Sequence, residues 1–210
     1  MGSTLLEQMA AGEAPPAVSF TVQQYHAMIE NGILREGDPV ELIDGVLIRK
    51  DRSTLGTNQM THDPRHALVI KRLLRLDRRL EPYDCHLQSQ LPVTLSEVSE
   101  PEPDAAVVKG TPEAFADHHP GPRDLVAVLE VADSSLQFDR TTKQGKYAIA
   151  GIGQYWILNL VEDQIELYES PISSEGRYAQ RVDYQLGQVV PLKINAATTI
   201  QVPVADLLSK

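Results

Sequence analysis

One stretch of the chain, LVAVLEVA at residues 125–132, is eight residues long and contains a single polar side chain, Glu130. A run of this length and composition is typical of a strand covered on both faces of a sheet. The carboxylate of Glu130 constrains the fold further, because a buried charge is costly unless a cation or hydrogen bonds compensate it. The alternative is an exposed position at the strand end or an arginine partner, and the run alone does not decide between them.

Two patterns near the N-terminus predict a helix followed by a hairpin. In FTVQQYHAMIENGIL, Thr21 is placed as an N-cap, Gln24 as its capping-box partner, and Gly32 at the C-terminal stop. In PVELIDGVLIRK, two apolar runs flank Asp44-Gly45, a dipeptide favoured in tight turns because both positions tolerate positive φ. We therefore expect a short helix and then two antiparallel strands.

A basic amphipathic helix is predicted from about Pro64 to Leu80. Its sequence places Leu73, Leu76 and Leu80 on one stripe, which indicates a buried face. The basic side chains fall elsewhere on the helix: Lys71, Arg75, Arg78 and Arg79. Lys71, Arg75 and Arg78 are candidate contacts for an anionic partner, and an ordinary solvated helix face is the alternative.

The rest of the chain predicts a mixed sheet with one helical crossover. HLQSQLPVTL and PDAAVVKG have the pattern of strands, and a Pro-rich connection, TPEAFADHHPGPRD, separates them from the buried run. After that run, DRTTKQGKYAIAGI has helical spacing and ends near Gly151, and QYWILNL and QIELYES are expected as strands. Further strands and a short helix complete the C-terminal part. The predicted fold class is α/β (α+β), a mixed β-sheet core flanked by helices, with an N-terminal hairpin.

Charge and composition limit the functions open to the chain. With 19 basic and 29 acidic residues the net charge is −10, which argues against a protein that coats DNA non-specifically. No apolar run approaches the roughly 18 residues of a membrane span, and the single cysteine, Cys85, has no internal disulfide partner. We expect a cytoplasmic protein with a disordered arm at 1–17 and a single domain at 18–210.

Carboxylates and lysines around the buried strand form the candidate site. Asp104 opens a strand after a proline, and acids on adjacent strands can share one hard cation such as Mg²⁺, although a Pro-Asp pair is also a turn signal. Lys143 and Lys146 both lie in the helix after Glu130. Their spacing does not choose between them, and either could be a solvated helix residue. Glu41, just before the hairpin turn, is a candidate further acid of the site.

Three histidines are weaker candidates. His66, near the start of the basic helix, either faces the site or caps the helix. His118 and His119 lie in the Pro-rich connection with no cysteine or third histidine at metal-ligand spacing, so we expect solvated loop residues there. The sequence has no Gly-rich phosphate loop, Gly-x-Ser-x-Gly elbow or HExxH helix, which removes the common alternative enzyme classes.

Taken together, these segments resemble the Uma-type (DUF820-like) restriction endonuclease family of the PD-(D/E)XK nuclease superfamily. The resemblance covers roughly residues 20–208. It rests on ELIDG at 41–45, His66, PEPDAAVV from Pro101, LVAVLEVADSS from Leu125 and FDRTTKQGKYAIAGIGQYWILNL from Phe138. The last two blocks are long and carry the Asp-Arg, Lys, Tyr and Tyr-Trp spacing in the order that the family has.

The resemblance implies a restriction-endonuclease-like fold and a DNA endonuclease that uses Mg²⁺ or Mn²⁺ to hydrolyse phosphodiester bonds. It further implies that Asp104 and Glu130 are the metal-binding acids. Lys143, and not Lys146, would be the catalytic lysine, with Glu41 as an accessory acid. By analogy with enzymes of this fold, we expect a homodimer acting on DNA.

One departure from the superfamily pattern concerns the lysine. The pattern places a lysine two residues after the second acid, where this chain has Ala132, so Lys143 would substitute for it from the next helix. Two other hypotheses stay open. The fold could serve as a catalytically silent module for DNA binding or protein interaction, which the acidic net charge supports, or as a metal-dependent hydrolase of another substrate.

Overall fold

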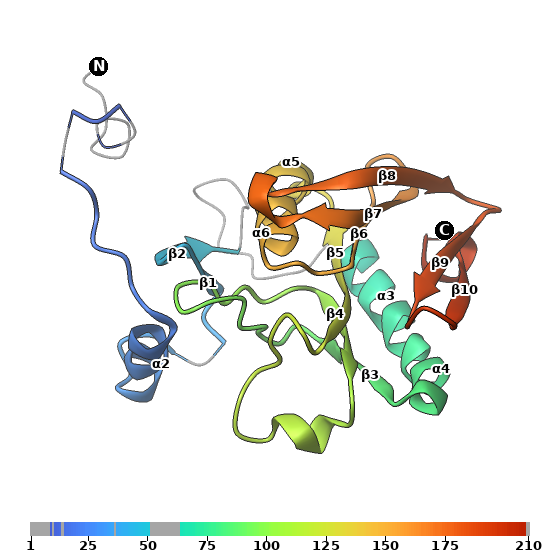
Figure 1. Cartoon of the computed structure of the whole chain (residues 1–210), viewed down its shortest axis with the longest axis horizontal. Helices are drawn as coiled ribbons and strands as arrows, with labels where there is room; N and C mark the ends of the chain where they lie inside the picture. The colour runs from blue at the N-terminus through green and yellow to red at the C-terminus, as the bar shows by residue number, and fades with distance from the viewer. Residues whose placement is uncertain (1–8, 10, 14, 36, 51–63, 209–210) are drawn as a thin grey trace.

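The computed structural model describes residues 9, 11–13, 15–35, 37–50 and 64–208, and its centre is a six-stranded mixed sheet (Figure 1). The strand order is β3-β4-β5-β6-β7-β8. The strands are β3 (Cys85–Ser89), β4 (Ala105–Lys109), β5 (Leu125–Ala132), β6 (Gln154–Asn159), β7 (Gln164–Ile172) and β8 (Arg177–Gln185). Only β5 and β6 pair in parallel; the other neighbours are antiparallel. The predicted mixed sheet with one helical crossover is therefore confirmed.

Helices cover both faces of this sheet (Figure 1). One face carries α3 (Pro64–Leu73), α4 (Asp77–Leu80), the two-stranded ribbon of β9 (Val189–Lys193) and β10 (Thr199–Pro203), and α7 (Val204–Leu208). The other face carries the crossover, which consists of α5 (Leu136–Phe138), a π-helical segment (Asp139–Lys143) and α6 (Gln144–Ile149). β5 separates two apolar clusters, with Leu129 and Val131 in one and Val128 and Ala132 in the other. Burial on both faces is what its sequence predicted.

The N-terminal helix and hairpin form as predicted. Helix α2 (Val22–Glu30) begins after Thr21, and both capping-box hydrogen bonds between Thr21 and Gln24 are present. The hairpin pairs β1 (Val40–Ile43) with β2 (Val46–Arg49), and its turn residues Asp44 and Gly45 have φ of 51° and 74°. At Gly45 a side chain would also collide with Ser19, because an added Cβ would lie 2.3 Å from its Cβ.

The hairpin is attached to the sheet through the segment that leads into β4. Leu42 of β1 forms an isolated antiparallel bridge with Glu100, with Glu100 N donating to Leu42 O at 2.7 Å. Gly45 N also donates to Val98 O at 2.7 Å. This attachment brings Glu41, the residue before Leu42, close to the start of β4.

Several predicted elements differ in their details. The strand predicted in HLQSQLPVTL ends at Ser89, because Gln90 adopts a left-handed conformation with φ of 53°. The helix predicted from Pro64 to Leu80 is interrupted by a 3₁₀ segment at Leu74–Leu76, although the predicted stripe of Leu73, Leu76 and Leu80 is buried. In the described part of the chain, no helix is long and apolar enough to cross a membrane. Residues 1–8, 10 and 14 of the predicted arm lie outside the described residues, and the single domain at 18–210 stays a prediction.

Candidate active site

Asp104 and Glu130 meet where β4 begins. The antiparallel register pairs Ala105 with Leu129, which places the residue before β4 beside Glu130 of β5. Val131 N donates to Asp104 Oδ2 at 2.8 Å, and Asp104 N lies 3.4 Å from Glu130 Oε2. The carboxylate of Asp104 is therefore held by the N–H of the residue after Glu130, and the carboxylate of Glu130 lies near the N–H of Asp104. The two carboxylates converge from adjacent strands.

Lys143 and Tyr147 reach Glu130 from the crossover. Lys143 Nζ donates to Glu130 Oε1 at 2.9 Å, and the hydroxyl of Tyr147 donates to the same oxygen at 2.8 Å. Lys143 Nζ also lies 3.3 Å from Oε2 of Glu41, which accepts a hydrogen bond from Glu102 N at 3.1 Å. One ammonium group thus bridges carboxylates from β1 and β5.

The acidic side chains at this cluster outnumber the one lysine among them. Burial raises the pKa of Glu130 to about 8, and the nearby carboxylates Asp139, Asp104 and Glu41 add to the effect against the opposing charge of Lys143. The pKa of Lys143 is raised: burial alone would lower it, but the surrounding carboxylates outweigh that effect and keep the side chain charged. Several acids around one lysine form an environment that a further cation would stabilise.

Asp104 remains ionised despite its partial burial. Burial would raise its pKa, but His66, whose Nε2 lies 3.2 Å from Asp104 Oδ2, and the Val131 N–H outweigh this, so the pKa is lowered. No described residue forms a hydrogen bond with Asp104 Oδ1. His66 therefore faces the site, one of the two positions that its sequence context left open.

The two acids suit a hard divalent cation. Asp104 Oδ1 and Glu130 Oε2 are the oxygens least engaged by other groups, since Lys143 and Tyr147 both bind Oε1. Mg²⁺ takes oxygen ligands and is commonly held by one or two carboxylates, with waters and substrate phosphates completing its shell. The donor set of this site therefore fits the metal class that the family resemblance implies.

Lys143 is positioned by an anchor one turn earlier in the crossover. Arg140 Nε donates to both oxygens of the fully buried Glu166 at 3.1 Å, and Asn159 Nδ2 donates to Glu166 Oε1 at 2.7 Å. Both Arg140 and Lys143 belong to the π-helical segment Asp139–Lys143. Short π-helical turns often occur at functional sites, and this one directs Lys143 inward to Glu130.

The structure separates the remaining candidates from this cluster. Lys146 Nζ pairs with Asp44 Oδ2 at 2.5 Å, at the hairpin turn and not at Glu130. Lys71, Arg75 and Arg78 are exposed on the helices that cover the opposite face of the sheet from Glu130. His118 is exposed, as expected, whereas His119 is half-buried and approaches other side chains.

Two contributors were not singled out from the sequence as site residues. Tyr147 lies four residues after Lys143, and this spacing puts both on one helix face, so it was a usable signal. Asp139 is buried within the π-helical segment, and its charge acts on both Glu130 and Lys143. Its location depends on the π-helical turn, which the sequence pattern did not indicate.

The fold of this chain matches that of a solved structure. A crystal structure described as "a putative nuclease belonging to DUF820", from Anabaena variabilis ATCC 29413, matches with a TM-score of 0.63 and 14% sequence identity. The match covers 90% of this chain and 98% of that chain. The family model Uma2, described as "Putative restriction endonuclease", matches residues 22–204. The chain therefore belongs to the Uma2 family, which confirms the resemblance seen in the sequence. No curated protein matches it.

Proposed function

We propose that the protein is a DNA endonuclease that hydrolyses phosphodiester bonds with Mg²⁺ or Mn²⁺ held by Asp104 and Glu130. The observation that carries the proposal is the convergence of these two carboxylates beside a buried lysine, Lys143. A bound ion would polarise a phosphate oxygen and lower the pKa of its water. This chemistry is what phosphodiester hydrolysis needs, and membership of the Uma2 family supports it.

Lys143 is proposed as the catalytic cation. Its ammonium group has three protons, and the two carboxylates that it contacts leave one proton to direct at a water or a phosphate oxygen. Because its pKa is raised, the group stays charged and can stabilise negative charge that develops on the phosphorus oxygens. Glu41 acts as an accessory acid that helps to hold this ammonium in place.

The other polar groups at the site are proposed to position these reacting groups. The Tyr147 hydroxyl holds Oε1 of Glu130, which leaves Oε2 directed toward Asp104. His66 holds Oδ2 of Asp104, which leaves Oδ1 for the cation. Both are assigned as positioning residues, since each acts through an acid that would touch the ion.

DNA is proposed to reach the site past the N-terminal end of α3. His66 lies near that end, and Lys71 follows five residues later, about 7.5 Å along the helix axis. Arg75 and Arg78 follow on the helical layer that covers the opposite face of the sheet from Glu130, so these three side chains are proposed to contact phosphates away from the cleaved bond. We further propose a homodimer, because two active sites related by a twofold axis match the two strands of a duplex. We also propose a cytoplasmic location.

Cleavage assays with plasmid DNA test the proposed function. Wild-type protein with Mg²⁺ or Mn²⁺ is expected to cut the plasmid, and Asp104→Ala and Lys143→Ala are expected to lose at least about a hundredfold in rate. Lys146→Ala is the matched control, because Lys146 lies on the same helix but pairs with Asp44, and it should keep wild-type activity.

Two outcomes would contradict the proposal. Retention of DNA on a gel without cleavage by any divalent metal would favour the silent module, which the net charge of −10 supports. Hydrolysis of small phosphodiesters with none of duplex DNA would favour a hydrolase of another substrate.

A further inference from the structure

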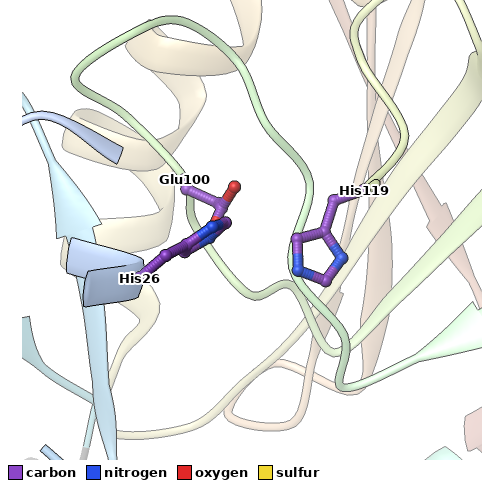
Figure 2. A group of neighbouring side chains, drawn as sticks. All are labelled: His26, Glu100 and His119. Atoms are coloured by element: carbon purple, nitrogen blue, oxygen red, sulfur yellow. The ribbon is translucent and has the colours of Figure 1, made fainter. Parts of the chain in front are cut away.

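A second cluster of metal-ligating side chains lies away from the nuclease site. Figure 2 shows His26, Glu100 and His119, with the ring of His119 turned toward the other two. One ligand atom from each residue lies within 4.8 Å of the others. The three residues come from α2, from the segment before β4, and from the connection between β4 and β5. The proposed nuclease mechanism uses none of them.

Glu100 is the fixed centre of this cluster. Its side chain is only 1% exposed, and Thr94 Oγ1 donates to its Oε2 at 2.6 Å. Its backbone is bonded to Leu42 of β1, so the carboxylate cannot move far. The other oxygen, Oε1, lies 2.5 Å from His26 Nε2. Oε2 is therefore held by Thr94, whereas Oε1 is paired with one imidazole and is the oxygen that a bound ion would share with it.

The two histidines are more adaptable. Both are half-buried, and their rings lie 5.8 Å apart between centroids at an interplanar angle of 81°. Ligand atoms around a tetrahedral zinc ion lie about 2.1 Å from the metal and therefore about 3.4 Å from one another. At present His26 Nε2 lies 2.5 Å from Glu100 Oε1, and all three ligand atoms lie within 4.8 Å of one another. A bound ion would separate the close pair, and rotation of the two partly exposed rings would bring the nitrogens to the tetrahedral spacing.

We propose that His26, Glu100 and His119 bind a divalent transition-metal ion of the zinc class. Two imidazole nitrogens and one carboxylate oxygen are a known ligand set for Zn²⁺, whereas Mg²⁺ prefers oxygen ligands alone. The three protein ligands leave the fourth position to water. This site is separate in chemistry and in residues from the pair of acids proposed to hold Mg²⁺ or Mn²⁺.

An ion bound there would fasten three parts of the protein together. It would link α2 to the connection between β4 and β5 and to the segment that ends at Asp104, four residues after Glu100. Glu100 is also bonded to Leu42, the neighbour of Glu41. The role of the site is therefore to stabilise the backbone segments that carry Asp104 and Glu41 of the proposed nuclease site.

Zinc binding to purified full-length protein tests this inference. The background is Asp104→Asn, which weakens the proposed nuclease metal site, and Zn²⁺ alone is titrated in competition with a chromophoric chelator. One tight Zn²⁺ per chain is expected, and His119→Ala should weaken its affinity at least tenfold. His118→Ala is the matched control, because this exposed neighbour pairs with Asp117 and should leave the affinity unchanged.

Cobalt supplies a second readout that does not depend on nuclease activity. Co²⁺ in place of Zn²⁺ should give visible absorption bands of a low-coordinate nitrogen and oxygen site, and Glu100→Gln and His119→Ala should remove them. Equal zinc affinity in His119→Ala and the background protein, or an equal loss in His118→Ala, would overturn the proposal. His119 lies in a surface connection, so its substitution leaves the sheet and its core intact.

Discussion

Lys143 donates a hydrogen bond of 2.9 Å to Oε1 of Glu130, although the two residues are thirteen positions apart and belong to a π-helical segment and a buried strand. The contact forms because the crossover returns over the face of the sheet to which the Glu130 side chain points. A pair of opposite charges in this setting is sensitive to change, since removing one partner leaves the other charge buried.

Replacing Lys143 with methionine separates catalysis from metal binding. The substitution should lower the rate of DNA cleavage by about 10² to 10³-fold, because a cation near the phosphate is lost. It should not weaken Mn²⁺ affinity, since the removed charge repels the ion. Isothermal titration with Mn²⁺ and plasmid cleavage measure the two effects, with Lys146→Met as the control. A loss of metal affinity in Lys143→Met, or an unchanged rate, would contradict the assigned role.

Arg75→Gln tests the basic face on α3 and α4. Arg75 is exposed and forms no hydrogen bond or ion pair with the described residues, so the free energy of unfolding should change by less than about 0.5 kcal/mol. DNA affinity should fall, and the slope of log K against log salt should decrease by about 0.9 if one phosphate contact is lost. Fluorescence anisotropy at several salt concentrations measures this slope. Arg177→Gln on β8 provides the comparison, and an equal effect from both substitutions would point to general charge instead of a DNA-binding face.

The ion pair between half-buried Arg140 and buried Glu166 predicts a specific dependence of stability on pH. Burial would raise the pKa of Glu166, but the hydrogen bonds from Arg140, Asn159 and Tyr168 outweigh it, so the pKa is lowered from its usual 4.5. A lowered folded-state pKa contributes stability that is present above pH 4.5 and is lost as pH falls through the folded-state value. Glu166→Gln should therefore destabilise the fold by about 1–3 kcal/mol at neutral pH, the usual cost of leaving buried hydrogen-bonding groups without a partner.

The difference between wild type and Glu166→Gln should shrink below pH 4.5, because the wild-type carboxylate becomes protonated there. Urea unfolding at a series of pH values measures both proteins. Glu175→Gln, at an exposed pair with Arg177, should show no such pH dependence. Parallel stability curves for wild type and Glu166→Gln would mean that the ion pair does not stabilise the fold.

Local patterns predicted the fold well, because its main elements depend on neighbouring residues. Thr21 and Gln24 fix the start of α2, and Asp44-Gly45 has the positive φ angles that the tight turn needs. The apolar run around Glu130 indicated both a central strand and a charge in need of a partner. Each of these inferences depends on residues within a few positions of one another.

The assembly of the site could not be predicted in the same way. Glu41 and Lys143 are far apart in the sequence, and their contact depends on docking of the hairpin through Leu42 and Glu100. The choice between Lys143 and Lys146 depends on the π-helical turn, which alters the helical register that sequence spacing assumes. His119 gave no metal signal because its neighbours in the cluster are distant in the sequence. Packing between distant segments decides the Glu41–Lys143 contact, the choice of Lys143 over Lys146 and the position of His119.

Asp104 and Glu130 are proposed to share one divalent cation, and anomalous scattering from crystals soaked in Mn²⁺ tests this sharing most directly. Wild-type crystals should show a peak between Oδ1 of Asp104 and Oε2 of Glu130, and crystals of Asp104→Asn should lack it or show it at much lower occupancy. A wild-type crystal with no peak between these carboxylates, or an equal peak after the substitution, would contradict the account.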